Sequence, residues 1–305
     1  MTTQRHIVYH VPALLEECIA GLCVKPDGHY IDVTFGGGGH SRAIMEKLGE
    51  KGRLMGMDQD LDAFANALAD ERFTFAHGNF AFVANFARYY DMVPVDGILA
   101  DLGVSFHHFD EASRGFSFRG DAPLDMRMNG SARLTAAHIV ASYDEDALAR
   151  LFTIYGELRQ ARRLAHAIVT RRAVKSIATT GDLVEVVSPL INPAQEKKEL
   201  SQVFQALRIE VNHEMDALEA LLRQSLELLK PGGRLVVLAY HSLEDRMVKN
   251  FMRSGNVEGR VEKDFYGHVT SPLRPVNRKV IVATDDEVAR NPRARSAKLR
   301  IGEKI

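Results

Sequence analysis

Four consecutive glycines between an apolar run and an amphipathic run constrain this chain more than any other feature of its sequence. They stand in the stretch Asp32-Val-Thr-Phe-Gly-Gly-Gly-Gly-His-Ser-Arg42. Residues 29–35 are rich in β-branched and aromatic side chains, which favours a strand, and apolar residues recur at helical spacing over 43–48. Glycines at such a junction let a ligand approach the backbone, and the free N–H groups of the first helical turn face it. The stretch predicts a strand, a tight loop and a helix start that bind a nucleotide-type cofactor.

The identity of that cofactor follows from the residues around the glycines. The dinucleotide fingerprint G-x-G-x-x-G needs a third glycine, but Ser41 or Arg42 occupies that position in the two registers. A carboxylate at Asp32 is unfavourable beside a pyrophosphate and favourable beside a cation. S-adenosylmethionine carries a sulfonium and an ammonium, and its carboxylate suits a helix start near His40. These features favour S-adenosylmethionine over a nicotinamide dinucleotide, and a merely flexible glycine loop is the alternative.

Acidic residues also end two later strands. The run 53–58 reads as a strand that ends in Asp58, where the hydroxyls of an adenosine ribose would donate hydrogen bonds. The run 95–101 ends in Asp101. In open α/β sheets ligands bind beyond the carboxyl ends of the strands, so we expect Asp32, Asp58 and Asp101 to line one crevice. A solvated strand end is the alternative for each acid taken singly.

Strands and helices alternate over the first hundred residues, after a short helix within 6–24. We expect strands at 29–35, 53–58, 73–77 and 95–102, and helices at 41–49, 60–69 and 80–90. This order predicts an α/β fold with a doubly wound, mostly parallel sheet, Rossmann-like, as in class I S-adenosylmethionine methyltransferases.

The alternation stops after residue 103. Helical patterns at 144–155, 157–172 and 182–190 predict an inserted helical substrate-recognition domain over 104–210. The methyltransferase domain, 1–103 plus 211–305, then resumes. Its expected elements are a long helix at 202–229, a buried strand at 235–240, late strands at 259–266 and 278–284, and a polar basic tail at 291–300.

Composition narrows the class of protein. With 46% hydrophobic and 26% charged residues, no apolar run of roughly 18 residues and no signal peptide, we expect a cytoplasmic globular protein with no membrane partner. Its two cysteines have no second pair with which to form a zinc site. Residues 150–175 contain seven Lys and Arg against one acid, and 246–305 contain fourteen against seven. These segments suggest a polyanionic substrate, with solvated helix surface as the alternative.

Two further residues are expected at the carboxyl edge of the sheet. Phe80, after the third strand, could lie against adenine, although a core position is almost as consistent with the sequence. His241 follows the strand at 235–240, and the capping-box spacing of Ser242 and Asp245 predicts a helix that begins at Ser242, with His241 pointing into the crevice. The alternative for His241 is simple packing of the strand end.

Several separated motifs, in order along the whole chain, resemble the MraW/RsmH methyltransferases. They are His10-Val-Pro, residues 32–41, Asp101-Leu-Gly-Val-Ser105, Arg114-Gly-Phe-Ser-Phe118, Pro123-Leu-Asp-Met-Arg-Met128, Phe204-Gln-Ala-Leu-Arg-Ile209, residues 241–246 and residues 291–300. The resemblance implies methylation of N4 of a cytidine in the decoding centre of 16S rRNA, near the P site. Such a base must be unstacked, and Phe116 and Phe118 are available to stack on it, although local core is the first expectation for both.

The chain departs from the family pattern in two places. The family usually has Ser-Pro-Gln where this chain has Phe106-His107-His108, so a histidine replaces a glutamine contact. The stretch Lys198-Glu-Leu-Ser-Gln-Val203 replaces the usual His-Pro-Ala-Thr-Arg-Thr. These departures predict an altered RNA-facing surface beside an intact cofactor site.

The sequence and the resemblance together give one set of candidate residues. Catalytic candidates are Asp101, His241 and Asp125. The cofactor S-adenosyl-L-methionine is expected to contact Gly38, Gly39, His40, Asp58, Phe80, Asp101, His108, Asp32 and Gly36. RNA is expected to contact Arg162, Arg163, Arg293 and Arg295, and no metal is expected. The expected partner is 16S rRNA within the small ribosomal subunit, and a homodimer stays open. A noncatalytic RNA-binding protein on a methyltransferase scaffold and an NAD-dependent oxidoreductase are the alternatives.

Overall fold

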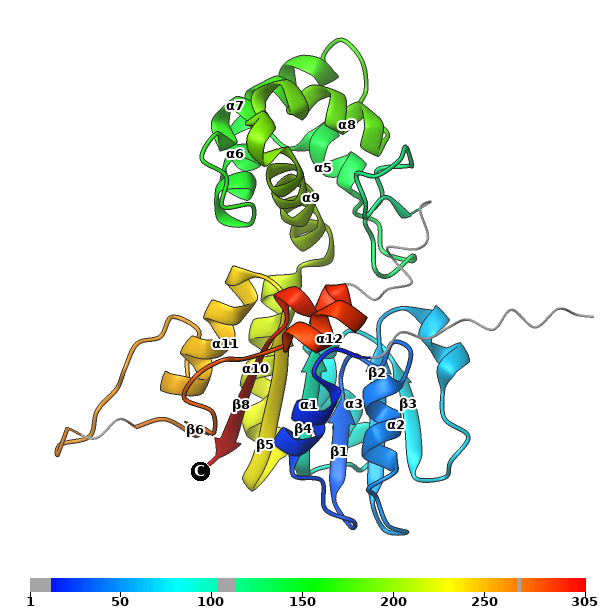
Figure 1. The fold of residues 1–305 in the computed structure, drawn as a ribbon, viewed down its shortest axis with the longest axis vertical. Coiled ribbons are helices and arrows are strands. Elements are labelled where there is room, and N and C mark those ends of the chain that lie inside the picture. The colour runs from blue at the N-terminus through cyan, green and yellow to red at the C-terminus, as the bar shows by residue number, and fades with distance from the viewer. Residues whose placement is uncertain (1–11, 104–113, 268–269) are drawn as a thin grey trace, which may run out of the picture. The chain divides into compact units, whose positions relative to one another are not determined.

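A computed structural model describes residues 12–103, 114–267 and 270–305 (Figure 1). The chain divides into two compact units, one of residues 1–103 with 216–305 and one of residues 104–215. The cofactor contact expected at His108 lies outside the described residues. Within the described part, no helix combines the length and the apolar character needed to cross a membrane.

The first unit is built on one mixed sheet with the strand order β3-β2-β1-β4-β5-β8-β6, and β7 also pairs with β8. The parallel strands are β1 (His29–Asp32), β2 (Arg53–Asp58), β3 (Phe73–His77), β4 (Val95–Asp101) and β5 (Leu229–Ala239). The antiparallel partners are β6 (Leu273–Pro275), β7 (Ile281–Val282) and β8 (Lys298–Lys304). The doubly wound, mostly parallel sheet predicted from the sequence is confirmed.

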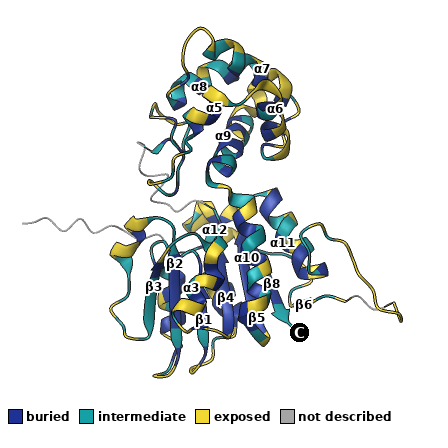
Figure 2. Cartoon of the chain, turned by 180° about the vertical axis from the view of Figure 1, so that it is seen from behind, coloured by how far each residue is buried: buried dark blue, intermediate teal, exposed yellow. Residues whose placement is uncertain are grey.

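Helices cover both faces of this sheet, as the two opposite views show (Figures 1 and 2). On one face lie α1 (Leu15–Leu22) and α2 (Gly39–Met45), and on the other lie α3 (Val83–Tyr89) and α10 (Glu214–Leu228). The unit also contains α11 (Ser242–Ser254), α12 (Asp285–Arg290) and the 3-10 helices η1 (Leu61–Asn66), η2 (Phe80–Phe82) and η6 (Pro292–Ser296). Because β4 and β5 are covered on both sides, their central residues are buried and apolar.

The C-terminal region differs from the expectation. No strand forms at 259–266, and the strand expected at 278–284 is reduced to β7. The expected basic tail is wrong, because its end begins β8, which pairs with β5 inside the sheet. Leu299 and Ile301 alternate into the core while Arg300 faces away from it and donates from Nε to Asp245 at 2.6 Å. The cationic residues of this segment led to the expectation of a solvated tail, whereas it includes the start of a strand whose alternate side chains are buried.

The single long helix expected at 202–229 is also wrong, because the chain bends at His213. This residue has φ 50°, in the left-handed region, and separates α9 (Glu196–Asn212) from α10. Asn212 stabilises the bend, since its Nδ2 donates to the Met126 carbonyl at 2.8 Å and its Oδ1 accepts from the Met128 N–H at 2.7 Å. Contacts with a distant loop thus override a continuous helical pattern. Two smaller differences are that the helix expected at 60–69 is the 3-10 helix η1, and that β5 begins at Leu229, before the strand expected at 235–240.

The second unit is helical and has its own apolar core. Its elements are α5 (Ala136–Ser142), α6 (Glu145–Ile154), α7 (Ala161–Arg172), α8 (Thr180–Val187), η4 (Ser188–Leu190), η5 (Pro193–Gln195) and α9. Phe116 is buried in this core, and Phe118 packs edge-on against Phe204 with ring centroids 5.7 Å apart. Both rings therefore take the core position that the sequence favoured. The unit ends at Met215, five residues beyond the expected 210.

Candidate functional site

The glycine turn between β1 and α2 depends on backbone that only glycine adopts without strain. Gly36 and Gly38 have φ angles of 48° and 73°. The Gly38 N–H donates to the Phe35 carbonyl at 2.7 Å and closes the turn. A Cβ on Gly38 would lie 2.9 Å from the Phe35 ring, and one on Gly39 would lie 2.3 Å from Pro12 Cγ. The turn therefore packs closely against Phe35 and Pro12 at Gly38 and Gly39, and only Gly36 has open space beside its backbone.

Asp32, at the end of β1, connects the strand to the turn and to the start of α2 by hydrogen bonds. Its carboxylate is buried and accepts hydrogen bonds from Ser41 Oγ at 2.7 Å and from the Thr34 N–H at 3.2 Å. Burial raises the pKa of Asp32, while the neighbouring His40 and the Ser41 hydrogen bond oppose that change. Burial likewise lowers the pKa of His40, which keeps the imidazole neutral near pH 7. Asp32 holds the turn in shape, and direct contact of Asp32 or His40 with a cofactor stays a prediction.

Asp58 fixes the other side of the turn from the end of β2. Its Oδ2 accepts from the Gly36 N–H at 2.8 Å, and its Oδ1 accepts from the Asp60 N–H at 2.9 Å. Asn66 adds a bond from its Nδ2 to the Gly36 carbonyl at 3.1 Å. At the end of β3 the Gly78 N–H donates to the Asp58 carbonyl at 2.8 Å, directly before the half-buried Phe80. The ends of β1, β2 and β3 are thus joined at one place.

Asp101 completes the group from the end of β4. Its N–H donates to Thr34 Oγ1 at 2.7 Å, and its Oδ1 accepts from the Tyr240 hydroxyl at 2.7 Å. Its Oδ2 lies 3.7 Å from Nδ1 of His40. Burial raises the pKa of Asp101 to about 7, against the opposing effect of the Tyr240 hydrogen bond. No Lys or Arg among the described residues forms an ion pair with this carboxylate.

The structure therefore brings Asp32, Asp58 and Asp101 to one edge of the sheet, around one turn. The half-buried Asp101 carboxylate, with a raised pKa and beside neutral His40, is a favourable neighbour for a ligand cation, because a positive charge would stabilise its ionised form. It is also suited to accept a proton near neutral pH.

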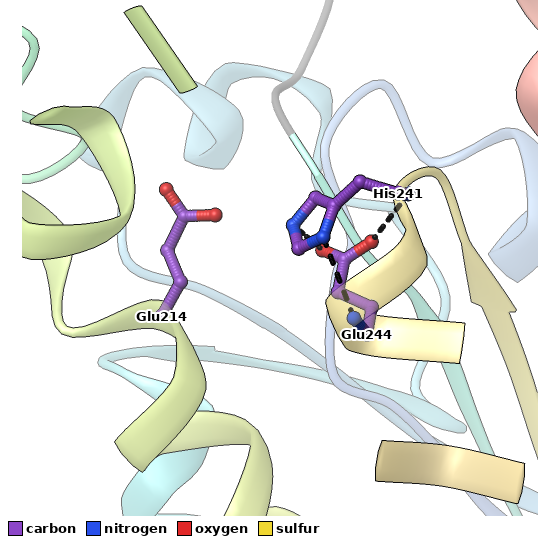
Figure 3. A group of neighbouring side chains, drawn as sticks. All are labelled: Glu214, His241 and Glu244. Carbon is purple, nitrogen blue, oxygen red and sulfur yellow. Dashed lines mark hydrogen bonds and ion pairs between the residues drawn. The ribbon is translucent and has the colours of Figure 1, made fainter. Parts of the chain in front are cut away.

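Tyr240 and Glu244 belong to this group, although the sequence analysis missed both. Glu244 is buried, and its Oε2 accepts from the N–H groups of Tyr240 at 2.8 Å and His241 at 3.2 Å. Figure 3 shows Glu244 beneath the His241 ring. In the sequence, the only available signals were a tyrosine at a strand end and a glutamate three residues after a histidine.

The helix start at His241 differs in detail from the expectation. His241 itself is the N-cap of α11, with Nδ1 accepting from the Glu244 N–H at 3.4 Å (Figure 3). The predicted capping box of Ser242 and Asp245 is therefore wrong, and Asp245 pairs with Arg300 instead. His241 lies against its own helix, which accounts for its position structurally, and a catalytic role for it stays a prediction.

The remaining candidates lie elsewhere. Asp125 is in the helical unit, where its carboxylate forms a two-point ion pair with Arg127 at 2.8 and 2.7 Å. Arg162 and Arg163 are exposed on α7. In the sheet unit, Arg293 and Arg295 are exposed on η6. The roles proposed for all five residues stay predictions.

Comparison with known proteins identifies the family. A model described as the MraW methylase family matches residues 7–305. The chain belongs to this family. The protein named ribosomal RNA small subunit methyltransferase H from Bacteroides thetaiotaomicron is 59% identical over 298 residues, covering 98% of both chains. The equally named proteins of Parabacteroides distasonis and Azobacteroides pseudotrichonymphae are 60% and 50% identical, over 97% and 98% of this chain and 98% of theirs. The resemblance noted in the sequence is confirmed, as is S-adenosyl-L-methionine as the cofactor of this MraW-family methylase.

Proposed function

We propose that this MraW-family protein transfers a methyl group from S-adenosylmethionine to N4 of a cytidine in 16S rRNA, in the decoding centre near the P site. Membership in a methylase family and relatives named for small-subunit ribosomal RNA support the substrate class. The observation that carries the proposal is Asp101, whose carboxylate has a pKa of about 7 and stands at a strand end beside the glycine turn. Such a group can serve both a cationic donor and an amine acceptor.

The residues at this edge fit the cofactor. The backbone of Gly36 leaves room for it, since a Cβ there would have only the Thr34 carbonyl oxygen, at 4.0 Å, within contact distance. Asp58 would accept hydrogen bonds from the ribose hydroxyls, and Phe80 would lie against adenine. Asp101 has no cationic side chain as an ion-pair partner among the described residues, so a sulfonium would supply the missing positive charge. S-adenosylmethionine contributes an electrophilic methyl group on that sulfur.

Asp101 would act on the acceptor amine. The lone pair of a cytosine N4 is delocalised into the ring, so it must be freed as the nitrogen pyramidalises. A carboxylate that accepts an N4–H bond favours this change and holds the nitrogen in line with the methyl group. Transfer of the methyl group to N4 would leave the electron pair of the broken S–C bond on sulfur and would make one N4 proton acidic. A carboxyl with a pKa of about 7 can take that proton.

The basic surfaces would hold the RNA. Arg162 and Arg163 on α7, and Arg293 and Arg295 on η6, are exposed and can contact phosphates. The partner would be 16S rRNA within the small ribosomal subunit, which places the reaction in the cytoplasm. Membership in a methylase family removes the nicotinamide alternative. A noncatalytic RNA-binding protein is the remaining rival.

The deciding experiment incubates the protein with methyl-labelled S-adenosylmethionine and small subunits from a strain that lacks the gene. Base-resolved mass spectrometry of the 16S rRNA should find the label on N4 of one decoding-centre cytidine. The variant Asp101→Asn, which keeps the shape of the side chain, should bind RNA but transfer no label. Label on a different atom would refute the N4 assignment, and RNA binding by the wild type without any transfer would favour the noncatalytic rival.

A further inference from the structure

The helical unit contains a pocket of about 660 Å³ that is separate from the site described above. Residues 157–163, which lead into α7, form one wall, and residues 189–202, from η4 to the first turns of α9, form the other. A volume of this size is in the range that protein sites offer to a nucleotide-sized ligand. Every lining residue belongs to the helical unit, and no residue of the glycine turn or of the three strand ends lines the pocket.

Three cationic side chains at this pocket lack a polar partner among the residues that the structure describes. Arg159, Arg163 and Lys198 are exposed, and none forms an ion pair or side-chain hydrogen bond with any residue in the described part of the chain. Elsewhere in the same unit, cations such as Arg127, Arg171 and Lys175 are paired with carboxylates. The pocket therefore gathers positive charge that the fold itself does not neutralise, which is the condition for binding an anion.

Acidic residues at the pocket do not cancel this charge. Glu157 and Glu199 also line it, so the cations outnumber the carboxylates by three to two. Glu199 accepts a hydrogen bond from Gln160 Nε2, which joins the start of α7 to the start of α9. The Glu199 carboxylate thus already has a hydrogen-bond donor within the pocket wall.

The other lining groups suit a nucleoside. The lining is mostly polar, and Asn192, Gln195 and Gln202 offer amide donors and acceptors beside the cations. Amides can form hydrogen bonds with the edges of a base, and neighbouring cations can contact its phosphates.

We propose that this pocket binds a nucleotide of the RNA substrate other than the methylated one, with its flanking phosphates held by Arg159, Arg163 and Lys198. The inference rests on the proposed function, since it assumes that the substrate is RNA. It adds an anchoring subsite in the helical unit, and it assigns to residues 198–202 a part in choosing the RNA sequence that is held there.

The test compares two double variants of the full-length protein. One is Arg159→Gln with Lys198→Gln, in the pocket. The other is Arg133→Gln with Arg150→Gln, which removes the same charge from exposed positions of the same unit that do not line the pocket. Fluorescence anisotropy measures the affinity of each for a labelled single-stranded RNA of decoding-region sequence over a range of salt concentrations.

Loss of two phosphate contacts should lower the slope of log K against log salt by about 1.4, and the affinity at 0.1 M salt by about 25-fold, since each contact to a single strand contributes roughly 0.7. The control pair should keep the slope of the wild type. Circular dichroism spectra and melting temperatures should match the wild type for both variants, which verifies that the helical unit folds. Equal slopes for the two double variants would overturn the proposal.

A free nucleotide is the competing occupant. If adenosine triphosphate binds the wild type, binding is lost in the pocket variant and the RNA slopes stay equal, the pocket serves a mononucleotide and the proposal is wrong. Failure of the proposed function has a different signature, because the pocket variant would then still differ from its control in RNA binding while no label appears on cytidine N4.

Discussion

The hydrogen bond from Tyr240 to Asp101 gives the sharpest test of the site. In the wild type the Tyr240 hydroxyl donates to Asp101 Oδ1 at 2.7 Å and opposes the rise in the pKa of Asp101, which stands at about 7. A hydrogen bond to a charged group contributes about 1.5–3 kcal/mol, and 1.36 kcal/mol corresponds to one pKa unit. The variant Tyr240→Phe should therefore raise the pKa of Asp101 by about one to two pH units.

The sign of the effect on cofactor affinity follows from the charge of the donor. A sulfonium favours the ionised carboxylate, so affinity for S-adenosylmethionine should rise as the pH increases through 7 in the wild type and through a higher pH in Tyr240→Phe. At pH 7 about half of the wild-type carboxylate is ionised, against about 1–10% in the variant, which predicts a loss of affinity of about five- to fifty-fold.

Isothermal titration calorimetry between pH 5.5 and 9 provides the assay. S-adenosylhomocysteine is the matched control ligand, because it shares the amino acid and adenosine but lacks the sulfonium charge, and its affinity should depend much less on the state of Asp101. An unchanged midpoint in Tyr240→Phe, or the same pH dependence for both ligands, would refute this account of Asp101.

Three further outcomes are expected. Asp58→Ala should weaken binding of S-adenosylmethionine at least tenfold, about the value of one charged hydrogen bond, and leave RNA affinity intact, so equal loss of both in parallel titrations would contradict the ribose assignment. Replacing Arg162 and Arg163 together by Gln should lower the salt slope of RNA binding by about 1.4, and a slope like that of the wild type would show that α7 does not face the RNA. Gly38→Ala should lower the unfolding free energy by about 1–3 kcal/mol, because its φ of 73° is strained for alanine and its Cβ would meet the Phe35 ring; an unchanged melting temperature would contradict this.

Local patterns in the sequence determined the parallel part of the sheet and the neighbourhood of its three acids. The expected runs end in Asp58 and Asp101, and Asp32 was expected near the end of the run 29–35, whose strand in fact ends at Asp32. Parallel strands present their carboxyl ends at one edge, so the neighbourhood of the three acids follows from the order of elements alone. The turn between β1 and α2 could also be predicted from its glycines, since left-handed backbone at Gly36 and Gly38 excludes most other residues.

The tertiary structure alone decided how those acids are tuned and where the chain ends its helices and strands. Tyr240 meets Asp101 across 139 positions of sequence, Asn212 stops a helix by bonding to residues 126 and 128, and β8 is buried because it pairs with β5. Periodicity and propensity describe the interactions of a residue with its near neighbours in the chain. The pKa of a carboxylate, the break in a helix and the burial of a charged segment depend on groups brought close by folding, which no local pattern encodes.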